Sequence, residues 1–246
     1  MKYFIHIPKT AGTSLRSGVF GIPRPGLHVQ PVYSMQDHQS LMGLRGCKDR
    51  QVLVFGHFSF GLHRQLEDDQ AEYATVLRDP VERVVSLYYH HLRFESSPYH
   101  SLLIERKLSL TDFVEACITP ETNNEVVRNF SASYGWLPLF CDRVANRWWS
   151  ATRGLPTRQI NERFRLRRAL RNLRMRFKHV GSLERLSDTA SFIESWTHMQ
   201  SGSLVLPREN TYSGERTCLT SAERCVIENA NQLDLELYER IVADPE

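Results

Sequence analysis

The sequence predicts an α/β fold in which helices flank a central parallel sheet in a three-layer sandwich, with a helical C-terminal half. Two observations predict the sheet: short apolar runs alternate with helical patterns through the first 94 residues, and two of these runs pass directly into a helix. Strands that alternate with helices are typical of parallel sheets covered on both faces. At 246 residues and 41% apolar content, the chain is expected to form a single domain over residues 1–246.

The elements of the first part follow in order. Apolar runs predict strands at residues 1–7, 51–55 and 73–77. Helical spacing of apolar residues predicts helices at residues 11–20, 35–45, 59–68 and 80–94. Pro23, Pro25 and Pro31 favour an irregular stretch between the first two of these helices.

The pattern from about residue 109 onward is mainly helical. Ser109 opens one helix with a capping-type start, and another helix is expected over residues 121–133. Residues 220–244 begin with the cap-like letters T-S-A-E and have the apolar rhythm of a packing helix. Residues 143–150, which include two tryptophans, are expected either to form an acceptor-side loop or to place a tryptophan in the core.

Residues 163–178 form a basic amphipathic pattern. Leu166, Leu170 and Leu173 recur at helical spacing, while five arginines lie largely on the other faces. Such a helix either binds an acidic glycan, RNA or a membrane surface, or presents a solvated face.

The first apolar run ends at Pro8 and leads through a short polar loop into a helical pattern. Backbone N–H groups at a helix N-terminus are unpaired and carry partial positive charge, so this turn suits a phosphate or sulfate group. A close backbone approach, hydroxyl donors and a mobile positive charge are supplied by Lys9, Thr10, Gly12, Thr13 and Ser14. Because the lysine precedes the glycine, the triphosphate loop G-x-x-x-x-G-K-[ST] is absent and a plain ATPase or GTPase is not indicated. The alternative is a simple connecting turn.

A second strand also runs directly into a helix. Arg78 stands at the carboxyl end of the strand, where open α/β sheets bind ligands, and Asp79 and Pro80 suit a helix start. Ser86 lies two turns into the helix and can face back toward Arg78, so a guanidinium and a hydroxyl form a second phosphate site. The alternative is a surface ion-pair cluster, to which Arg83 would belong.

These two blocks resemble the nucleotide-binding motifs of the sulfotransferases that use 3′-phosphoadenosine 5′-phosphosulfate (PAPS). Residues 4–15 resemble their 5′-phosphosulfate loop, and residues 78–89 resemble their 3′-phosphate motif. The wording is closest to the heparan sulfate 2-O-sulfotransferase-like branch (sulfotransferase family 2), in which I-P-K-T-A-G-T-S and R-D-P-x-E-R-x-x-S-x-Y-Y recur. Shorter matches follow at residues 55–57, 124–128, 180–184 and 231–238. The resemblance implies a P-loop-type sandwich, with the last strand at residues 179–183.

The resemblance also implies roles for particular residues. It implies that the 5′-phosphosulfate of PAPS is held by Lys9, Thr10, Ala11, Gly12, Thr13 and Ser14, and the 3′-phosphate by Arg78 and Ser86. Arg208 and Asn210 resemble the late loop that closes over the nucleotide. His57 is implied to be the catalytic base, because the family places a histidine after a glycine at the end of the strand that corresponds to residues 51–55. Phe55 stands where the animal enzymes carry a further histidine.

Sulfuryl transfer needs a base and an electrostatic clamp. A neutral imidazole at His57 can take the proton of an acceptor hydroxyl, while Lys9 and the loop amides stabilise charge on the sulfuryl group. His63 is a competing base or an acceptor contact, and His91 faces either the acceptor or solvent. His6 is expected to pack or to hydrogen-bond within the first strand. No metal is expected, because the donor is already activated.

The expected acceptor is a carbohydrate hydroxyl, on a glycan or a glycosylated small molecule, and a lipid or secondary-metabolite alcohol stays open. Asn124 and Arg128 are four residues apart on one helical face, where they grip the acceptor or act as an internal brace. Two rival functions remain: a P-loop nucleoside or small-molecule kinase, for which Asp79 is the evident metal-binding candidate, and a non-catalytic nucleotide-binding protein.

Bulk properties bound the partners and the location. The net charge of +3 is modest, so no nucleic-acid partner is expected. The chain begins four residues before its first motif and has no apolar run near 18 residues, so no integral membrane segment and a cytoplasmic location are expected. The five cysteines are odd in number and lack C-x-x-C spacing, which favours reduced thiols. The oligomeric state is left open.

Overall fold

The computed structural model describes residues 1–20, 26–47, 51–132, 156–206 and 218–243. Its backbone falls into two compact units. Of the described residues, the first unit contains 1–77, 132 and 171–206, and the second contains 78–131, 156–170 and 218–243. This division does not test the expectation of a single domain, which stays a prediction.

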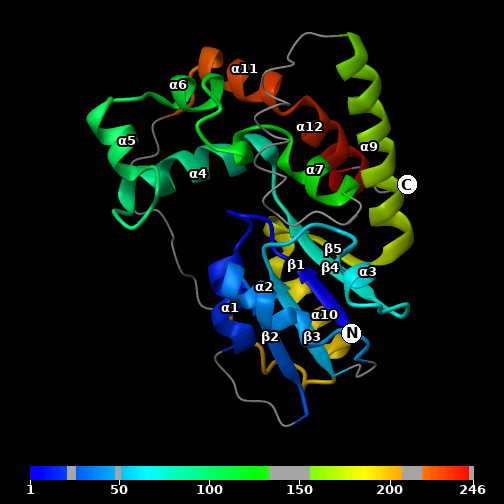
Figure 1. The fold of residues 1–246 in the computed structure, drawn as a ribbon. Coiled ribbons are helices and arrows are strands. Elements are labelled where there is room, and N and C mark those ends of the chain that lie inside the picture. Colours follow the sequence, from blue (N-terminus) through cyan, green and yellow to red (C-terminus); the bar gives the residue numbers. More distant parts are fainter. Residues whose placement is uncertain (21–25, 48–50, 133–155, 207–217, 244–246) are drawn as a thin grey trace. The chain divides into compact units, whose positions relative to one another are not determined.

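The first unit is built on a five-stranded sheet (Figure 1). Its strands are β1 (Lys2–Ile5), β2 (His28–Val32), β3 (Val52–Gly56), β4 (Glu72–Leu77) and β5 (Phe177–Ser182). They lie in the order β2-β3-β1-β4-β5, and every pair is parallel. The predicted parallel sheet is confirmed, and the carboxyl ends of its strands share one edge.

The strand β2 corrects the sequence prediction, which treated the stretch around Pro31 as irregular. His28 to Val32 pair with β3 in register, with Pro31 opposite Phe55. Because β2 is at the edge of the sheet and pairs on one side only, a proline without an N–H group is tolerated there.

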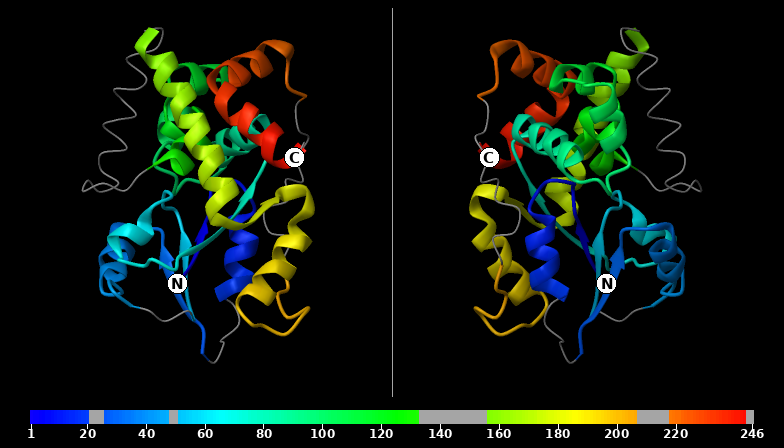
Figure 2. Two further views of the ribbon diagram at one scale, coloured as in Figure 1. Left: turned by 90° about the vertical axis from the view of Figure 1, so that its right-hand side faces the viewer. Right: turned by 90° about the vertical axis from the view of Figure 1, so that its left-hand side faces the viewer.

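Helices cover both faces of this sheet. They are α1 (Gly12–Phe20), α2 (Met35–Met42), α3 (Leu62–Gln65), the 3-10 helix η2 (Leu183–Arg185) and α10 (Leu186–Trp196). Figure 2 shows α1 and α10 on one face and α2 and α3 on the other, so the three-layer arrangement is confirmed. The predicted helix 59–68 is wrong at both ends: α3 has only four residues, because Gly61 precedes it with φ 103° and the helix stops at Leu66.

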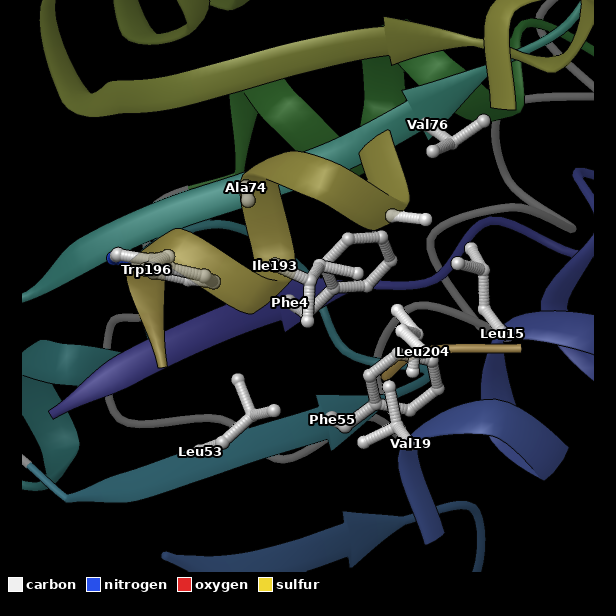
Figure 3. Close-up of a cluster of buried hydrophobic side chains, with 11 residues drawn as sticks. Phe4, Leu15, Val19, Leu53, Phe55, Ala74, Val76, Ile193, Trp196 and Leu204 are labelled. Carbon is white, nitrogen blue, oxygen red and sulfur yellow. The ribbon is translucent and has the colours of Figure 1, made fainter. Parts of the chain in front are cut away.

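The core of the first unit lies between the sheet and the helices α1 and α10 (Figure 3). Phe4 of β1 stacks on Phe55 of β3 with ring centroids 4.9 Å apart. Leu15 and Val19 of α1 and Ile193 of α10 pack on them. Since side chains alternate along a strand, the residue two after Phe4, which is His6, faces the same side as this core.

The second unit is helical. Its elements are α4 (Pro80–Arg93), α5 (His100–Glu105), α6 (Leu110–Glu115), η1 (Pro120–Thr122), α7 (Glu125–Ser131), α11 (Ser221–Ala230), α12 (Gln232–Tyr238) and η3 (Glu239–Ala243). The predicted caps are confirmed: Asp79 accepts from the N–H of Glu82 at 2.9 Å, and Ser109 forms a capping box with Asp112. The helix α5 was not anticipated from the sequence.

Two predicted long helices are broken in the second unit. The expected helix 121–133 is interrupted at Asn124, which has φ 45°, and the expected helix 220–244 is interrupted at Asn231. The two asparagines bond across these breaks, since the side chain of Asn231 accepts from the N–H of Asn124 at 3.1 Å and donates to the carbonyl of Thr122 at 2.9 Å. These tertiary hydrogen bonds replace the helical ones that the breaks remove.

The helix α9 (Pro156–Arg176) carries the basic pattern and begins before the predicted range. It ends at Arg176, because the chain continues as β5 from Phe177. Leu166, Leu170 and Leu173 are buried as predicted. No helix in the described ranges is long and apolar enough to span a bilayer.

Candidate functional site

The loop after β1 is shaped to present backbone N–H groups. Lys9 and Ala11 have positive φ values of 70° and 62°, so the chain turns sharply before α1 begins at Gly12. Within the described ranges, the N–H groups of Gly12, Thr13 and Ser14 have no backbone acceptor. Alternating backbone conformations of this kind form a concave anion-binding nest, here placed at a helix N-terminus.

The hydroxyl groups of the loop have different roles. Thr10 is buried, and its Oγ1 donates to the carbonyl of Ile7 at 2.8 Å, so this hydroxyl closes the turn. Thr13 is exposed, whereas Ser14 is mostly buried at the first turn of α1. Of the three predicted hydroxyl donors, only that of Thr10 bonds within the described loop, and a role in anion binding stays a prediction for all three.

Gly12 is required by a neighbouring side chain. A β-carbon at residue 12 would lie 1.7 Å from both Cε1 and Nε2 of His6. The glycine was predicted to allow close approach of an anion, and the structure shows that it makes room for an imidazole ring. His6 therefore packs directly against the phosphate-type loop.

His57 is held in place by the edge strand. Its N–H donates to the carbonyl of Val32 at 2.7 Å, and a β-carbon at Gly56 would lie 2.1 Å from the oxygen of that carbonyl. Glycine is therefore needed before the histidine for β2 to approach. The ring of His57 reaches His6, with Nε2 of His57 3.1 Å from Nδ1 of His6.

Tyr33 and Arg16, which the sequence did not single out, also lie beside the two histidines. The ring of Tyr33, which follows β2, meets His57 edge-on with centroids 4.8 Å apart. The guanidinium carbon of Arg16, from α1, lies 5.1 Å from the centroid of the Tyr33 ring. Both the Tyr33 Oη and the His6 Nε2 are buried without a hydrogen-bond partner within the described ranges. Only the register of β1, β2 and β3 brings these side chains together.

The site keeps its histidines neutral. Removal of water from around the ring, with a smaller effect of the Arg16 charge, lowers the pKa of His57 to about 4, although the residue as a whole is exposed at the surface. Burial lowers the pKa of His6 well below its ordinary value, and the charges of His57, Lys9 and Arg16 add to this effect. At neutral pH both rings are therefore uncharged.

His63 lies toward the other end of the sheet. Its Nδ1 is 2.7 Å from the Oη of Tyr73, and Tyr73 pairs with Tyr3 in the sheet register. His6 is three residues beyond Tyr3, which is about 10 Å along an extended strand. Burial, together with Arg64 and Arg176, lowers the pKa of His63 to about 4. With its Nδ1 engaged by Tyr73, His63 is remote from the loop, and this placement favours His57 as the base.

The second predicted phosphate site lies at the start of α4, in the second unit. Arg78 is 11% exposed, and its Nη2 lies 3.5 Å from a carboxylate oxygen of Glu82. Arg78 precedes α4 by two residues, and Ser86 lies one helical turn beyond Glu82 on the same face of α4. The alternative of a surface cluster is wrong for Arg83, which is fully buried and donates to Glu125 at 2.6 Å.

Two predicted acceptor contacts, Asn124 and Arg128, are hydrogen-bonded inside the second unit. The Oδ1 of Asn124 accepts from the N–H groups of Leu233 and Asp234 at 2.9 and 3.2 Å. Arg128 donates to the carbonyl of Pro120 at 2.6 Å, and its Nε donates to that of Asn124 at 3.4 Å. These contacts favour the internal-brace alternative for Asn124 and Arg128.

His91 is also part of the packing of this unit. It is 8% exposed, its Nδ1 is hydrogen-bonded to the hydroxyl of Ser97, and its ring lies edge-on to that of Tyr99. A role in acceptor binding gains no support from this placement.

The remaining predictions concern the late loop, the cysteines and metals. Arg208, Asn210, the segment 143–150 and Cys141 lie outside the described residues. The cysteines in the described part of the chain have free thiols. Within the same ranges, no group of three or more His, Cys, Asp or Glu side chains is arranged to hold a metal ion.

The family model and the curated relatives agree with the resemblance to sulfotransferases. A model of the sulfotransferase family matches residues 37–243, a range that includes His57 and Arg78 and begins after the loop at Lys9. Heparan sulfate 2-O-sulfotransferase 1 of Gallus gallus and of Pongo abelii are each 26% identical over 208 residues, which is 77% of this chain and 52% of each relative. This chain thus spans about half the length of the curated relatives that it matches. A match to the crystal structure of mouse sulfotransferase SULT7A1 complexed with PAP covers 94% of this chain and 63% of the SULT7A1 chain, with a TM-score of 0.41 and 11% identity.

Proposed function

Because the chain belongs to the sulfotransferase family, we propose that it is a PAPS-dependent O-sulfotransferase that transfers a sulfuryl group to an acceptor hydroxyl. The observation that carries this proposal is the position of the His6 ring. One edge of the ring packs against Gly12 of the loop, and its Nδ1 lies 3.1 Å from His57. An anion-binding loop and an exposed neutral histidine are therefore one imidazole ring apart.

The loop fits the phosphosulfate end of the donor. The N–H groups of Gly12, Thr13 and Ser14 have no backbone acceptor within the described ranges, and two buried polar atoms nearby, His6 Nε2 and Tyr33 Oη, have no partner there either. Unpaired donors at a helix N-terminus suit a sulfate or phosphate. Lys9, at the head of the loop, adds a full positive charge.

In the proposed reaction, His57 removes the proton of the acceptor hydroxyl. The acceptor oxygen forms a bond to sulfur, and the bond between sulfur and the bridging oxygen of the donor breaks. The leaving bisphosphate keeps the electron pair of that bond, and Lys9 and the loop amides stabilise its charge. Because the pKa of His57 lies at about 4, the imidazole is neutral and ready to accept a proton at pH 7.

The 3′-phosphate of the donor is assigned to Arg78 and Ser86. The support is that the guanidinium of Arg78 reaches Glu82 in the first turn of α4, and that Ser86 lies one turn beyond Glu82 on the same face of that helix. A guanidinium binds a phosphate with two parallel hydrogen bonds, which gives both affinity and orientation.

For the acceptor we propose a carbohydrate hydroxyl, on a glycan or a glycosylated small molecule. The support is the name of the two relatives, heparan sulfate 2-O-sulfotransferase 1, at 26% identity. The absence of a metal requirement and the cytoplasmic location stay predictions.

Titration calorimetry with adenosine 3′,5′-bisphosphate, ATP and adenosine 5′-phosphate, without added metal, tests the donor assignment. Tight binding of the bisphosphate alone is expected. A preference for ATP would favour the rival kinase function, and no binding of any of the three would refute a nucleotide site.

The base is tested separately with His57→Ala. We expect turnover of a sulfated glycan acceptor to fall about 10²- to 10⁴-fold, the range for loss of a general base, with bisphosphate affinity unchanged. His63→Ala is the matched control and should keep wild-type turnover. A His57→Ala variant with full activity would refute His57 as the base, whereas the absence of turnover in the wild type as well would favour a non-catalytic nucleotide-binding protein.

A further inference from the structure

His6 lies between the loop at Gly12 and the ring of His57, and packing alone does not explain this position. It lies one residue beyond β1, and its N–H donates to the carbonyl of Gly56 at 2.8 Å, just before His57. The His57 N–H is fixed in turn by Val32 at 2.7 Å. Both backbones are thus held by the sheet, and their rings meet with Nδ1 of His6 3.1 Å from Nε2 of His57.

The hydrogen bond between these rings has two possible directions. If His57 donates from Nε2, its Nδ1 keeps a lone pair and can take a proton from an acceptor hydroxyl. If His6 donates from Nδ1, the only lone pair of the neutral His57 ring is used by His6, and His57 cannot act as a base. The ring that donates therefore decides whether His57 is competent.

The opposite edge of the His6 ring relates this choice to the loop. Its Nε2 is buried without a partner within the described ranges, and it lies where a β-carbon of residue 12 would be. When His57 donates to His6 Nδ1, the hydrogen of His6 is on Nε2, and this N–H dipole is directed at the anion-binding loop. An anion in the loop stabilises this arrangement electrostatically, and it therefore favours the competent form of His57.

The charges around the two rings keep His6 from becoming positively charged. Lys9 of the loop and Arg16 of α1 both oppose a positive charge on His6, whose pKa burial has already lowered. Tyr33 contacts the His57 ring edge-on and carries no charge at neutral pH. His6 does not store the proton, so its contribution is the orientation of His57.

We propose that His6 is a positioning residue that accepts a hydrogen bond from the Nε2–H of His57, holds His57 with a free Nδ1, and links this state to occupancy of the loop at Gly12. The catalytic part of this inference rests on the proposed function, whereas the tautomer of His57 does not.

The tautomer is read directly by nitrogen–proton correlation NMR of the imidazole rings in the full chain, free and with adenosine 3′,5′-bisphosphate. The signals are assigned by their loss in His57→Ala and His6→Asn. We expect both His57 and His6 to carry hydrogen on Nε2 in the bisphosphate complex. A His57 protonated on Nδ1 in that complex overturns the proposal, whatever the activity.

Turnover tests the effect of the contact with a matched pair of variants. Asparagine and leucine have the same shape, but only asparagine places a polar atom near the position of Nδ1. His6→Leu is expected to lower kcat about 10- to 100-fold, as loss of an orienting partner does, and to weaken bisphosphate binding, because the Nε2–H that faces the loop is lost. His6→Asn should recover most of the loss of kcat but not the loss of affinity, since asparagine replaces only the polar atom near Nδ1.

A double variant separates orientation from other effects. In the His57→Ala background, His6→Leu should cause no further loss of kcat, because the residue acts through His57. An equal loss in both backgrounds, or equal kcat in His6→Leu and His6→Asn, overturns the proposal. If no acceptor is turned over by any variant, the proposed function fails, and the NMR result still decides the role of His6.

Discussion

Replacement of Gly12 by alanine is expected to damage the site through His6. The new β-carbon would lie 1.7 Å from Cε1 and Nε2 of that ring. Non-bonded heavy atoms rest at about 3.5–4.0 Å from each other, so the ring or the first turn of α1 has to move by roughly 2 Å. Overpacking of this kind costs about 1–3 kcal/mol of unfolding free energy. At about 2–4 °C per kcal/mol for a chain of this length, Tm should fall by about 2–12 °C.

The same shift reaches the proposed base. His6 contacts His57 at 3.1 Å, so a displaced His6 ring no longer orients it. A misplacement of about 1 Å in a catalytic group lowers turnover by about 10²-fold, and we expect kcat of Gly12→Ala to fall by about that factor.

Calorimetric melting, bisphosphate titration and steady-state turnover of Gly12→Ala provide the measurements. The matched control is Gly12→Ala combined with His6→Ala, in which the β-carbon occupies the space of the missing ring. Its Tm and bisphosphate affinity should return to those of His6→Ala alone. A double variant as unstable as Gly12→Ala, or a Gly12→Ala protein with wild-type Tm and kcat, would refute the reasoning.

Three further predictions follow from the other contacts. Because a base must be neutral and the pKa of His57 lies at about 4, kcat/KM should stay level down to about pH 5 and fall as the pH passes about 4, whereas a break near the ordinary histidine value of about 6.5 would contradict this. Arg83→Met leaves the buried side chain of Glu125, 2.6 Å away in the native protein, without its ion-pair partner. Denaturant unfolding should show a loss of about 3–5 kcal/mol of unfolding free energy, and the addition of Glu125→Leu should recover most of this loss. Arg78→Ala should weaken the binding of adenosine 3′,5′-bisphosphate by about 2–5 kcal/mol and leave the binding of adenosine 5′-phosphate unchanged, since only the former has a 3′-phosphate. An equal loss of affinity for both ligands in calorimetry would show that Arg78 does not bind the 3′-phosphate.

Features set by neighbours in the sequence were predicted well. The strand–loop–helix order at residues 4–14 and the cap at Asp79 depend on local backbone preferences, and both appear in the structure. Features set by distant partners were not. Asn124 has a helix-compatible position in the sequence, but its amide is held by α12, more than one hundred residues away, and this bond accompanies the break between η1 and α7.

The edge strand β2 also depends on distant partners, and the sequence did not predict it. Pro31 argues against a strand when the sequence is read alone, because proline removes a ladder donor. Position in the sheet decides otherwise, since an edge strand needs donors on one side only. Without β2, neither the carbonyl of Val32 that fixes His57 nor the ring of Tyr33 beside it could be anticipated.

The sequence by itself determined that a basic, hydroxyl-rich loop begins a helix after one strand, that an arginine begins a helix after another, and that a histidine follows a glycine between them. These are local patterns, and local backbone chemistry is enough to recognise them. Only the tertiary structure decided that His6 joins the loop to His57 and that His63 lies at the level of Tyr73 instead. The physical reason is register: a shift of one residue between parallel strands turns each side chain to the other face, and no single strand encodes its alignment with its neighbours.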